Sequence, residues 1–407
     1  MRGSSEAPLA SRFLRQIATA TWSVVALGIP LYRILPPEMA RAWSGLIALL
    51  IVATILLGLG QRPKWWGIWA FAGYASIVAG ITSSGASGPA ATLSIGAQLL
   101  LILGMAPFAI RGTIARAPEA LRVATVTFLI AQTVSSSAGV MQILGVSTLD
   151  QVQANGRSPG LAGHPNVLGL MSTIAIIVCI AIVLRRGRKS FLAWIALAAN
   201  TLGLVSTGSL SSMLPCLIAV AVLLLANGIG PTRLLVTAGL SAAAVTFAIS
   251  LPPISDAMRD PLSRILQVTG QTNEISTLEI RRQTYDSAWE YIQIDPLLGK
   301  GLDVESAAAI DLGTVVHSLP LRAWYQGGIV LAAAVAALVV ASFVLVVRAL
   351  VRKQDATATA VIVMIILYSL TSALFEQAYY WLPLLAAWGT LRRSSPRPVP
   401  DVSTAST

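Results

Sequence analysis

The side chains best suited to acid–base catalysis are the only two histidines, His164 and His317. A neutral imidazole accepts a proton near neutral pH, which is the role of a general base. Each histidine directly precedes the expected start of an apolar helix: Pro165 suits a first helical position and Ser318 an N-cap. The positive end of a helix disfavours imidazolium, so both are expected to be neutral at pH 7. Either histidine can also serve only as a helix cap.

Arg157 and Arg281 are the cations best placed to bind an anion. Arg157 is the only basic residue in the segment Asn155–Gly160, where it can clamp a phosphate or extend to lipid headgroups. Arg281 lies on the otherwise apolar face of a predicted helix, and a lone cation at the edge of the hydrocarbon is costly. An anionic partner is therefore expected for Arg281. Arg282 is rotated off that face and can pair with Asp286 one turn later.

The helix that carries Arg281 has clear boundary signals. Ser276 and Glu279 form a capping box, and the pattern continues to Asp295 before Pro296 stops it. Its apolar face contains Leu278, Tyr285, Ala288 and Ile292 at helical spacing. We expect this helix to lie against a membrane domain.

The remaining polar residues exclude several other kinds of site. Cys179 and Cys216 lack metal-type spacing, and no carboxylate pair stands in a predicted span or short loop, so no metal site is expected. No Asp, Glu, Lys or His occurs within the predicted spans. Ion-coupled transporters usually need such groups in the membrane, which weakens a transporter interpretation.

The composition indicates a polytopic, all-α membrane protein. Of the 407 residues, 55% are hydrophobic and 11% charged, whereas soluble domains carry about 25% charged residues. Apolar runs approach the roughly 20 residues that cross a bilayer as a helix. The expected spans are 16–32, 43–60, 65–81, 92–110, 122–143, 165–184, 191–206, 210–228, 233–251, 319–347, 357–374 and 377–391.

The distribution of charge predicts the orientation. Most of the 28 basic residues fall in segments on the same side as the N-terminus, which places both termini in the cytoplasm. The net charge of +11 therefore reflects orientation signals, and nucleic-acid binding is not expected. One long outward segment, 252–318, separates helices 1–9 (1–251) from helices 10–12 (319–391), and a cytoplasmic tail follows (392–407). A loop of that length is expected to be functional and to contain helices.

Three motifs in this order resemble those of the bacterial O-antigen ligase / O-antigen polymerase superfamily. The first runs from Arg157 through Gly163 to His164-Pro165-Asn166. The second is Arg281…Tyr285…Pro296-Leu-Leu-Gly-Lys-Gly301, and the third is His317…Gly328. The stretch covers about residues 150–340, and the span count extends the resemblance to the whole chain.

The sequence departs from the family pattern at four positions. Leu210 follows Ser209 where the family often has arginine, so a second phosphate-binding arginine is missing there. Arg281, Arg282 or Arg322 are candidates to compensate. Tyr285 replaces the usual Trp, Ser318 the usual Asn, and Gln326 a common acidic residue.

The resemblance implies a membrane glycosyltransferase. Such enzymes move a glycan from undecaprenyl diphosphate to an acceptor sugar hydroxyl, such as that of the lipid A core. They act at the periplasmic face of the bacterial inner membrane, with inversion and without nucleotide sugar, metal or cofactor. The roles this implies are His317 as catalytic base; Arg157, Arg281 and, as second choice, Arg282 for the diphosphate; and His164, Asn166, Tyr285 and Arg322 in support.

Other functions remain open on sequence alone. A ligase joins the finished polymer to its acceptor, whereas a polymerase of the same superfamily extends the lipid-linked chain. A single large outer loop without a soluble C-terminal domain favours the ligase. A lipid-linked-glycan transporter and a structural membrane protein are the alternatives from other classes. The sugar, the linkage and the oligomeric state are not encoded in any recognisable motif.

Overall fold

The computed structural model describes residues 9–32, 34–146, 156–186, 190–230, 232, 277–309, 314–372, 375 and 377–391. Within these ranges the protein is all-α: no strand forms, and one isolated β-bridge joins Ala308 to Val315. The predicted span 233–251 and Ser276 lie outside the described residues. Each of the other predicted spans coincides with a helix or a run of helices.

The first half of the chain forms a series of apolar helices, of which several begin with a proline at a position where no backbone N–H is needed. The helices are α1 (Leu9–Gly28), a short 3-10 turn η1 (Ile29–Leu31), α2 (Pro37–Leu56), α3 (Trp66–Thr82), α4 (Pro89–Leu99), the π-helical η2 (Leu100–Met105), α5 (Ala106–Arg116) and α6 (Pro118–Ile143).

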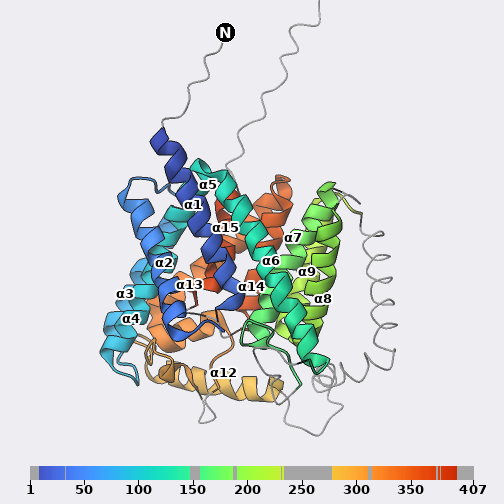
Figure 1. Ribbon diagram of the computed structural model, residues 1–407. Coiled ribbons are helices and arrows are strands. Elements are labelled where there is room, and N and C mark those ends of the chain that lie inside the picture. The colour runs from blue at the N-terminus through green and yellow to red at the C-terminus, as the bar shows by residue number, and fades with distance from the viewer. Residues whose placement is uncertain are drawn as a thin grey trace, which may run out of the picture.

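The second half adds the helices that surround the predicted catalytic residues. They are α7 (Pro165–Arg186), α8 (Phe191–Ser206), α9 (Leu210–Ala226), α12 (Thr277–Ile294), the 3-10 turn η4 (Glu305–Ala307), α13 (Leu319–Val351), α14 (Ala356–Ser369) and α15 (Ala378–Thr390). Most of these helices run side by side as a bundle, whereas α12 lies across one end of it (Figure 1).

Several helices have the length and composition of membrane spans. In the described part of the chain, five are long and apolar enough to cross a bilayer: Pro37–Leu56, Pro89–Arg116, Pro118–Ile143, Pro165–Arg186 and Leu319–Val351. Shorter apolar helices, such as α3 and α8, lie among them. The chain is therefore a multi-pass membrane protein, and the count of twelve spans stays a prediction.

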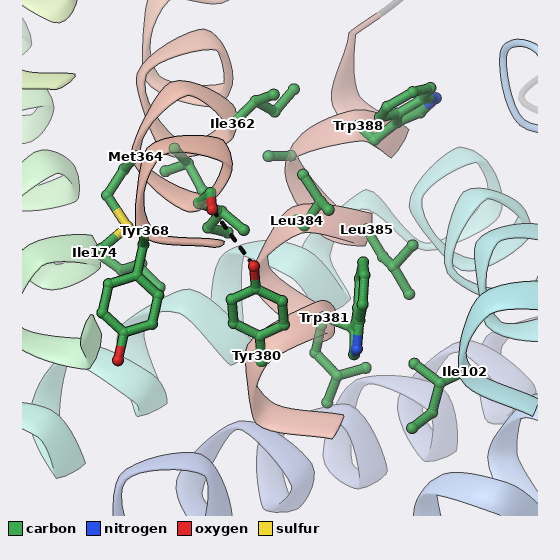
Figure 2. Close-up of a cluster of buried hydrophobic side chains, with 14 of the residues drawn as sticks. Ile102, Ile174, Ile362, Met364, Tyr368, Tyr380, Trp381, Leu384, Leu385 and Trp388 are labelled. Carbon is green, nitrogen blue, oxygen red and sulfur yellow. Dashed lines mark hydrogen bonds between the residues drawn. The ribbon is translucent and has the colours of Figure 1, made fainter. Parts of the chain in front are cut away.

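Close contacts hold the bundle together where small residues face one another. A Cβ atom added at Gly73 of α3 would lie 2.6 Å from the Cα of Gly104, so these backbones touch. Aromatic residues fill the space around α14 and α15, where Tyr380 donates a hydrogen bond to the Ile365 carbonyl at 3.5 Å. The Tyr368 hydroxyl points away from this apolar cluster (Figure 2). The Tyr368 hydroxyl of α14 is therefore free to contact residues outside the apolar cluster.

The crossing helix α12 follows its sequence prediction closely. It ends at Ile294, one residue before the expected limit, and packs on α13. Ala288 and Ile292 are buried against Val316 and Tyr325, as the apolar face requires. Arg282 does pair with Asp286, at 3.9 Å. Both side chains are exposed, so this pair contributes little stability.

A break in α13 explains the glycines of the second and third motifs. Gly328 has φ 72°, which is outside the helical range, and it interrupts the helix. The backbone N–H groups of Lys300 and Gly301 donate to the carbonyls of Tyr325 and Gln326 at 2.8 and 2.9 Å. A Cβ at Gly299 would lie 2.5 Å from the nitrogen of Gly328, so only glycine permits this approach. The loop Gly299–Gly301, which we call the glycine loop, is thereby fixed to the first part of α13.

Candidate active site

Arg157 is a buried residue that the protein itself orients. Its side chain is 6% exposed. Nε donates to the Thr207 carbonyl at 2.7 Å and a terminal nitrogen donates to Oδ1 of Asn166 at 2.6 Å. Of the two alternatives for Arg157, extension to lipid headgroups is therefore wrong. Its guanidinium is held in a single direction, as a pre-formed anion clamp requires.

The loop that carries Arg157 is fixed to α6 by Gln142. Its side-chain oxygen accepts hydrogen bonds from the Ser158 hydroxyl at 2.5 Å and the Gly160 N–H at 2.9 Å, and its amide donates to the Gly160 carbonyl at 3.1 Å. Gly160 adopts φ 55°, and a Cβ there would lie 2.5 Å from the Ser135 carbonyl oxygen. The first motif therefore needs glycine for its backbone path.

His164 and Asn166 shape the start of α7. Nδ1 of His164 accepts the N–H of Asn166 at 3.1 Å, so the imidazole acts as a helix cap. The Asn166 side-chain oxygen accepts from Ser209 at 3.1 Å as well as from Arg157. Its main-chain carbonyl accepts from the Tyr368 hydroxyl at 3.0 Å. Asn166 thus connects the Arg157 loop with α9 and α14.

Arg281 enters the same region from α12. Its Nε is buried and has no hydrogen-bond partner among the described residues. The Arg281 charge interacts with His317 and with Tyr368. No ion pair to Arg281 is found in the described part of the protein. A buried donor without a partner is costly, so an anionic ligand would satisfy it.

His317 is held as a neutral base. Its Nδ1 lies 2.6 Å from the Val315 carbonyl, which can only accept, so Nδ1 carries the proton and Nε2 is left as the acceptor. Burial, the Arg281 charge and then Arg322 lower the pKa of His317 to about 4, while the bond to Val315 opposes them. The expected neutrality is confirmed, but its main cause is burial.

The neighbours of His317 fix its main chain. The Tyr285 hydroxyl donates to the His317 carbonyl at 3.1 Å and so ties α12 to the start of α13. Ser318 occupies the N-cap position of α13, but its hydroxyl makes no capping hydrogen bond. Its carbonyl instead accepts the first helical N–H, from Arg322, at 2.8 Å. The role predicted for the Ser318 side chain is therefore wrong.

Arg322 is buried and positioned through Gln326. Its Nε donates to Oε1 of Gln326 at 2.5 Å, and its guanidinium lies 5.6 Å from the centre of the Phe375 ring. The Gln326 amide donates to the carbonyls of Gly301 and Asp303 at 2.9 and 3.2 Å. A carboxylate at position 326 could not donate to them. The amide at this position therefore connects Arg322 with the glycine loop.

Asp303 extends this support to the far side of the loop. Its buried carboxylate accepts from Ser306 and from the backbone and hydroxyl of Ser87, in the α3–α4 connection. Burial alone would raise the pKa of Asp303, but the hydrogen bonds from Ser306 and Ser87 outweigh it and lower the pKa. The carboxylate is therefore ionised and its acceptor sites are occupied by protein.

The residues predicted from the three motifs come together, with Arg282 as the exception. Arg157 and Arg281 both interact with Tyr368, and Arg281 and Arg322 both interact with His317. We call Arg157, Asn166, Arg281, His317 and Tyr368 the outer cluster, after the outward orientation that the sequence predicts for this end of the bundle. Arg282 is exposed and paired outside it. Sequence reasoning missed Tyr368 and Asp303, although the polar hydroxyl of Tyr368 within an apolar run was an available signal.

The outer cluster offers guanidinium groups and a neutral imidazole. Guanidinium binds phosphate groups well, and a neutral imidazole can accept a proton from a hydroxyl. In the described ranges, no three His, Cys, Asp or Glu side chains are grouped so that they could hold a metal ion. The cluster can therefore bind an anion beside a proton acceptor.

Comparison with known proteins shows similarity to a protein family. A family model described as O-antigen ligase matches residues 195–336, which include most of α8, all of α9 and α12, and the first part of α13. The match contains Arg281, His317 and Arg322, whereas Arg157 precedes it. It confirms the superfamily that the motifs resemble. No curated protein matches the chain.

Proposed function

We propose that this multi-pass membrane protein, which carries a domain of the O-antigen ligase and polymerase superfamily, transfers a glycan from undecaprenyl diphosphate to an acceptor sugar hydroxyl. The proposed acceptor is the lipid A core, and the reaction takes place at the periplasmic face of the bacterial inner membrane. The observation that carries this proposal is the buried Nε of Arg281, which has no partner in the described part of the protein and lies beside a neutral His317.

The proposed reaction is a direct displacement. The acceptor hydroxyl oxygen attacks the anomeric carbon of the donor, and the bond from that carbon to the diphosphate oxygen breaks. The hydroxyl proton goes to Nε2 of His317, which is the acceptor nitrogen of the ring. Undecaprenyl diphosphate leaves with the bonding electron pair, and the anomeric configuration is inverted.

Arg281 and Arg157 are proposed to bind the leaving diphosphate. Negative charge on the diphosphate grows as the glycosidic bond breaks, so cations aimed at it bind the transition state better than the ground state. Arg157 is fixed by Thr207 and Asn166 before any ligand arrives. The bound anion would also give the buried Nε of Arg281 its missing partner.

A transfer assay with two histidine variants tests this function. The assay uses an undecaprenyl-diphosphate-linked glycan as donor and lipid A core as acceptor, with purified protein in detergent. His317→Asn removes the base and is expected to lower the transfer rate by about 10²–10⁴-fold. His164→Asn keeps a helix-capping oxygen and should lose only a few-fold. Equal activity of His317→Asn and the wild type would refute the role of His317.

The products of the same assay distinguish the ligase from the polymerase. A ligase releases undecaprenyl diphosphate and leaves the glycan on the lipid A core. A polymerase gives a longer glycan that remains on undecaprenyl diphosphate, even when no lipid A core is present. Mass spectrometry of the lipid fraction separates these products. Chain extension without acceptor would reject the ligase and retain the superfamily chemistry.

A further inference from the structure

A second cluster of cations lies far from the outer cluster. Arg62 and Lys64 stand in the connection between α2 and α3, and Arg348 and Arg352 lie at the C-terminal end of α13. His317 precedes the other end of the same helix. The 30 residues from Leu319 to Arg348 correspond to about 45 Å of helix, which is roughly the thickness of a bilayer with its headgroups. The two clusters are therefore at opposite ends of the bundle.

Tryptophan rings hold three of these cations in place. The Arg62 guanidinium lies 5.2 Å from the centre of the Trp66 ring. Lys64 and Arg348 lie 5.6 and 5.2 Å from the centre of the Trp65 ring. Cations over aromatic faces are attracted to the ring, while their charge remains available to another ligand.

The four cations have no carboxylate partner among the described residues. Burial, and then the nearby charges of Arg352 and Arg348, lower the pKa of Lys64. The nearest acid along the chain, Asp355, instead caps α14 and lies 3.8 Å from Arg185. The charges of Lys64, Arg348 and Arg352 repel one another, and a bound anion would reduce this repulsion.

An apolar groove opens beside these cations. Its lining residues are Trp65, Trp66, Gly67, Ile68, Ala341 and Val344, and we call it the Trp65 groove. The groove is shallow and widely open to its surroundings, with a volume of about 740 Å³. It lies between α3 and α13, and its tryptophans are the same rings that carry the cations. The cations and the apolar groove therefore lie next to each other and can contact the same ligand.

We propose that the Trp65 groove binds an anionic phospholipid of the surrounding membrane. Lys64, Arg348, Arg62 and Arg352 contact the phosphate of the headgroup, and an acyl chain occupies the apolar groove. A soluble anion would use the cations but not the groove, and a zwitterionic lipid would use the groove but carries no net charge. The combination of both features selects an amphiphile with an anionic head.

Competition binding tests the proposal on the full-length protein in detergent. Fluorescent phosphatidylglycerol is the probe, and unlabelled phosphatidylglycerol, phosphatidylcholine and sodium diphosphate are the competitors. Phosphatidylglycerol should compete at least tenfold better than either of the others. Lys64→Gln/Arg348→Gln removes two charges and keeps much of each side chain. It should weaken phosphatidylglycerol binding by about tenfold or more.

A matched control variant loses two positive charges outside the Trp65 groove. Arg122→Gln/Arg186→Gln neutralises two exposed arginines at other helix ends and should bind like the wild type. If the first variant fails to fold, as judged by its melting temperature in phosphatidylcholine, Arg62→Gln/Arg352→Gln tests the same site. Equal weakening in the control, or diphosphate competing as well as phosphatidylglycerol, would overturn the proposal.

Discussion

Arg157 and Arg281 approach Tyr368 from distant parts of the chain, but the protein holds them to different degrees. Arg157 is almost fully buried, and backbone and side-chain oxygens of Thr207 and Asn166 accept its hydrogen bonds. Arg281 stands on α12, and its buried Nε has no acceptor among the described residues. Two arginines with the same proposed ligand therefore differ in what surrounds them before that ligand binds.

This difference separates structural from functional roles. Removing Arg157 takes a hydrogen-bond donor away from two acceptors, the Thr207 carbonyl and the Asn166 side chain, so it affects the folded protein as well as any ligand. The Nε of Arg281 makes no hydrogen bond to any residue that the structure describes, so removing Arg281 breaks none there. Its loss should therefore affect the ligand and leave folding nearly intact. Activity and stability measured together distinguish these two effects.

Of the changes that test this comparison, Arg281→Gln is expected to have the largest effect on transfer. Loss of a cation aimed at the developing diphosphate charge should lower the transfer rate by about 10²–10³-fold. The melting temperature should stay close to that of the wild type. Arg282→Gln is the matched control, since Arg282 is the exposed neighbour on the same helix. A similar loss in both variants would mean that only the general charge of α12 matters.

Arg157→Gln should lower both activity and stability. The Thr207 carbonyl loses its donor and the Asn166 side-chain oxygen keeps only Ser209, which costs about 2–3 kcal/mol of unfolding free energy. Thermal unfolding of the purified protein measures this cost beside the transfer assay. Unchanged stability with lost activity would make Arg157 equivalent to Arg281 and would remove the distinction between them.

The pH dependence of kcat/KM should show the low pKa of His317. The base must be neutral, and its pKa is about 4, so activity is lost only as pH falls through that value. At pH 5 about nine-tenths of His317 is neutral, whereas an ordinary histidine with a pKa of about 6.5 would be only about 3% neutral. An acid limb near pH 6.5 would contradict the burial of His317 in the free enzyme.

The sequence predicted most of the helices because long apolar runs and prolines are local signals. Through three motifs that lie apart in the chain, it also predicted four of the five residues of the outer cluster, all except Tyr368. It could not predict the hydrogen bonds that position these residues. The capping by His164 and the amide bridge of Gln326 depend on contacts between distant segments. Ser318 occupies the N-cap position of α13, but its hydroxyl makes no capping hydrogen bond. A residue type that is preferred at a cap position therefore need not form that hydrogen bond.

Tyr368 was missed for the same reason. It stands in an apolar run, and only the packing of α14 against α7 brings its hydroxyl to Asn166. The charges of both arginines reach it, although neither is close to it in sequence. A residue whose role depends on such packing leaves little trace in the pattern of apolar residues.

Tyr368→Phe should give the smallest effect and tests whether the two sides of the outer cluster act together. The change removes the hydrogen bond to the Asn166 carbonyl and costs about 1 kcal/mol of stability. Because Arg157 depends on Asn166, transfer should fall by several-fold. Tyr380→Phe is the control, since its hydroxyl bonds Ile365 inside the apolar cluster (Figure 2). In a double-mutant cycle, Tyr368→Phe should couple to Arg157→Gln, because both act through Asn166. Strict additivity of the two changes would mean that Tyr368 and the Arg157 side act independently.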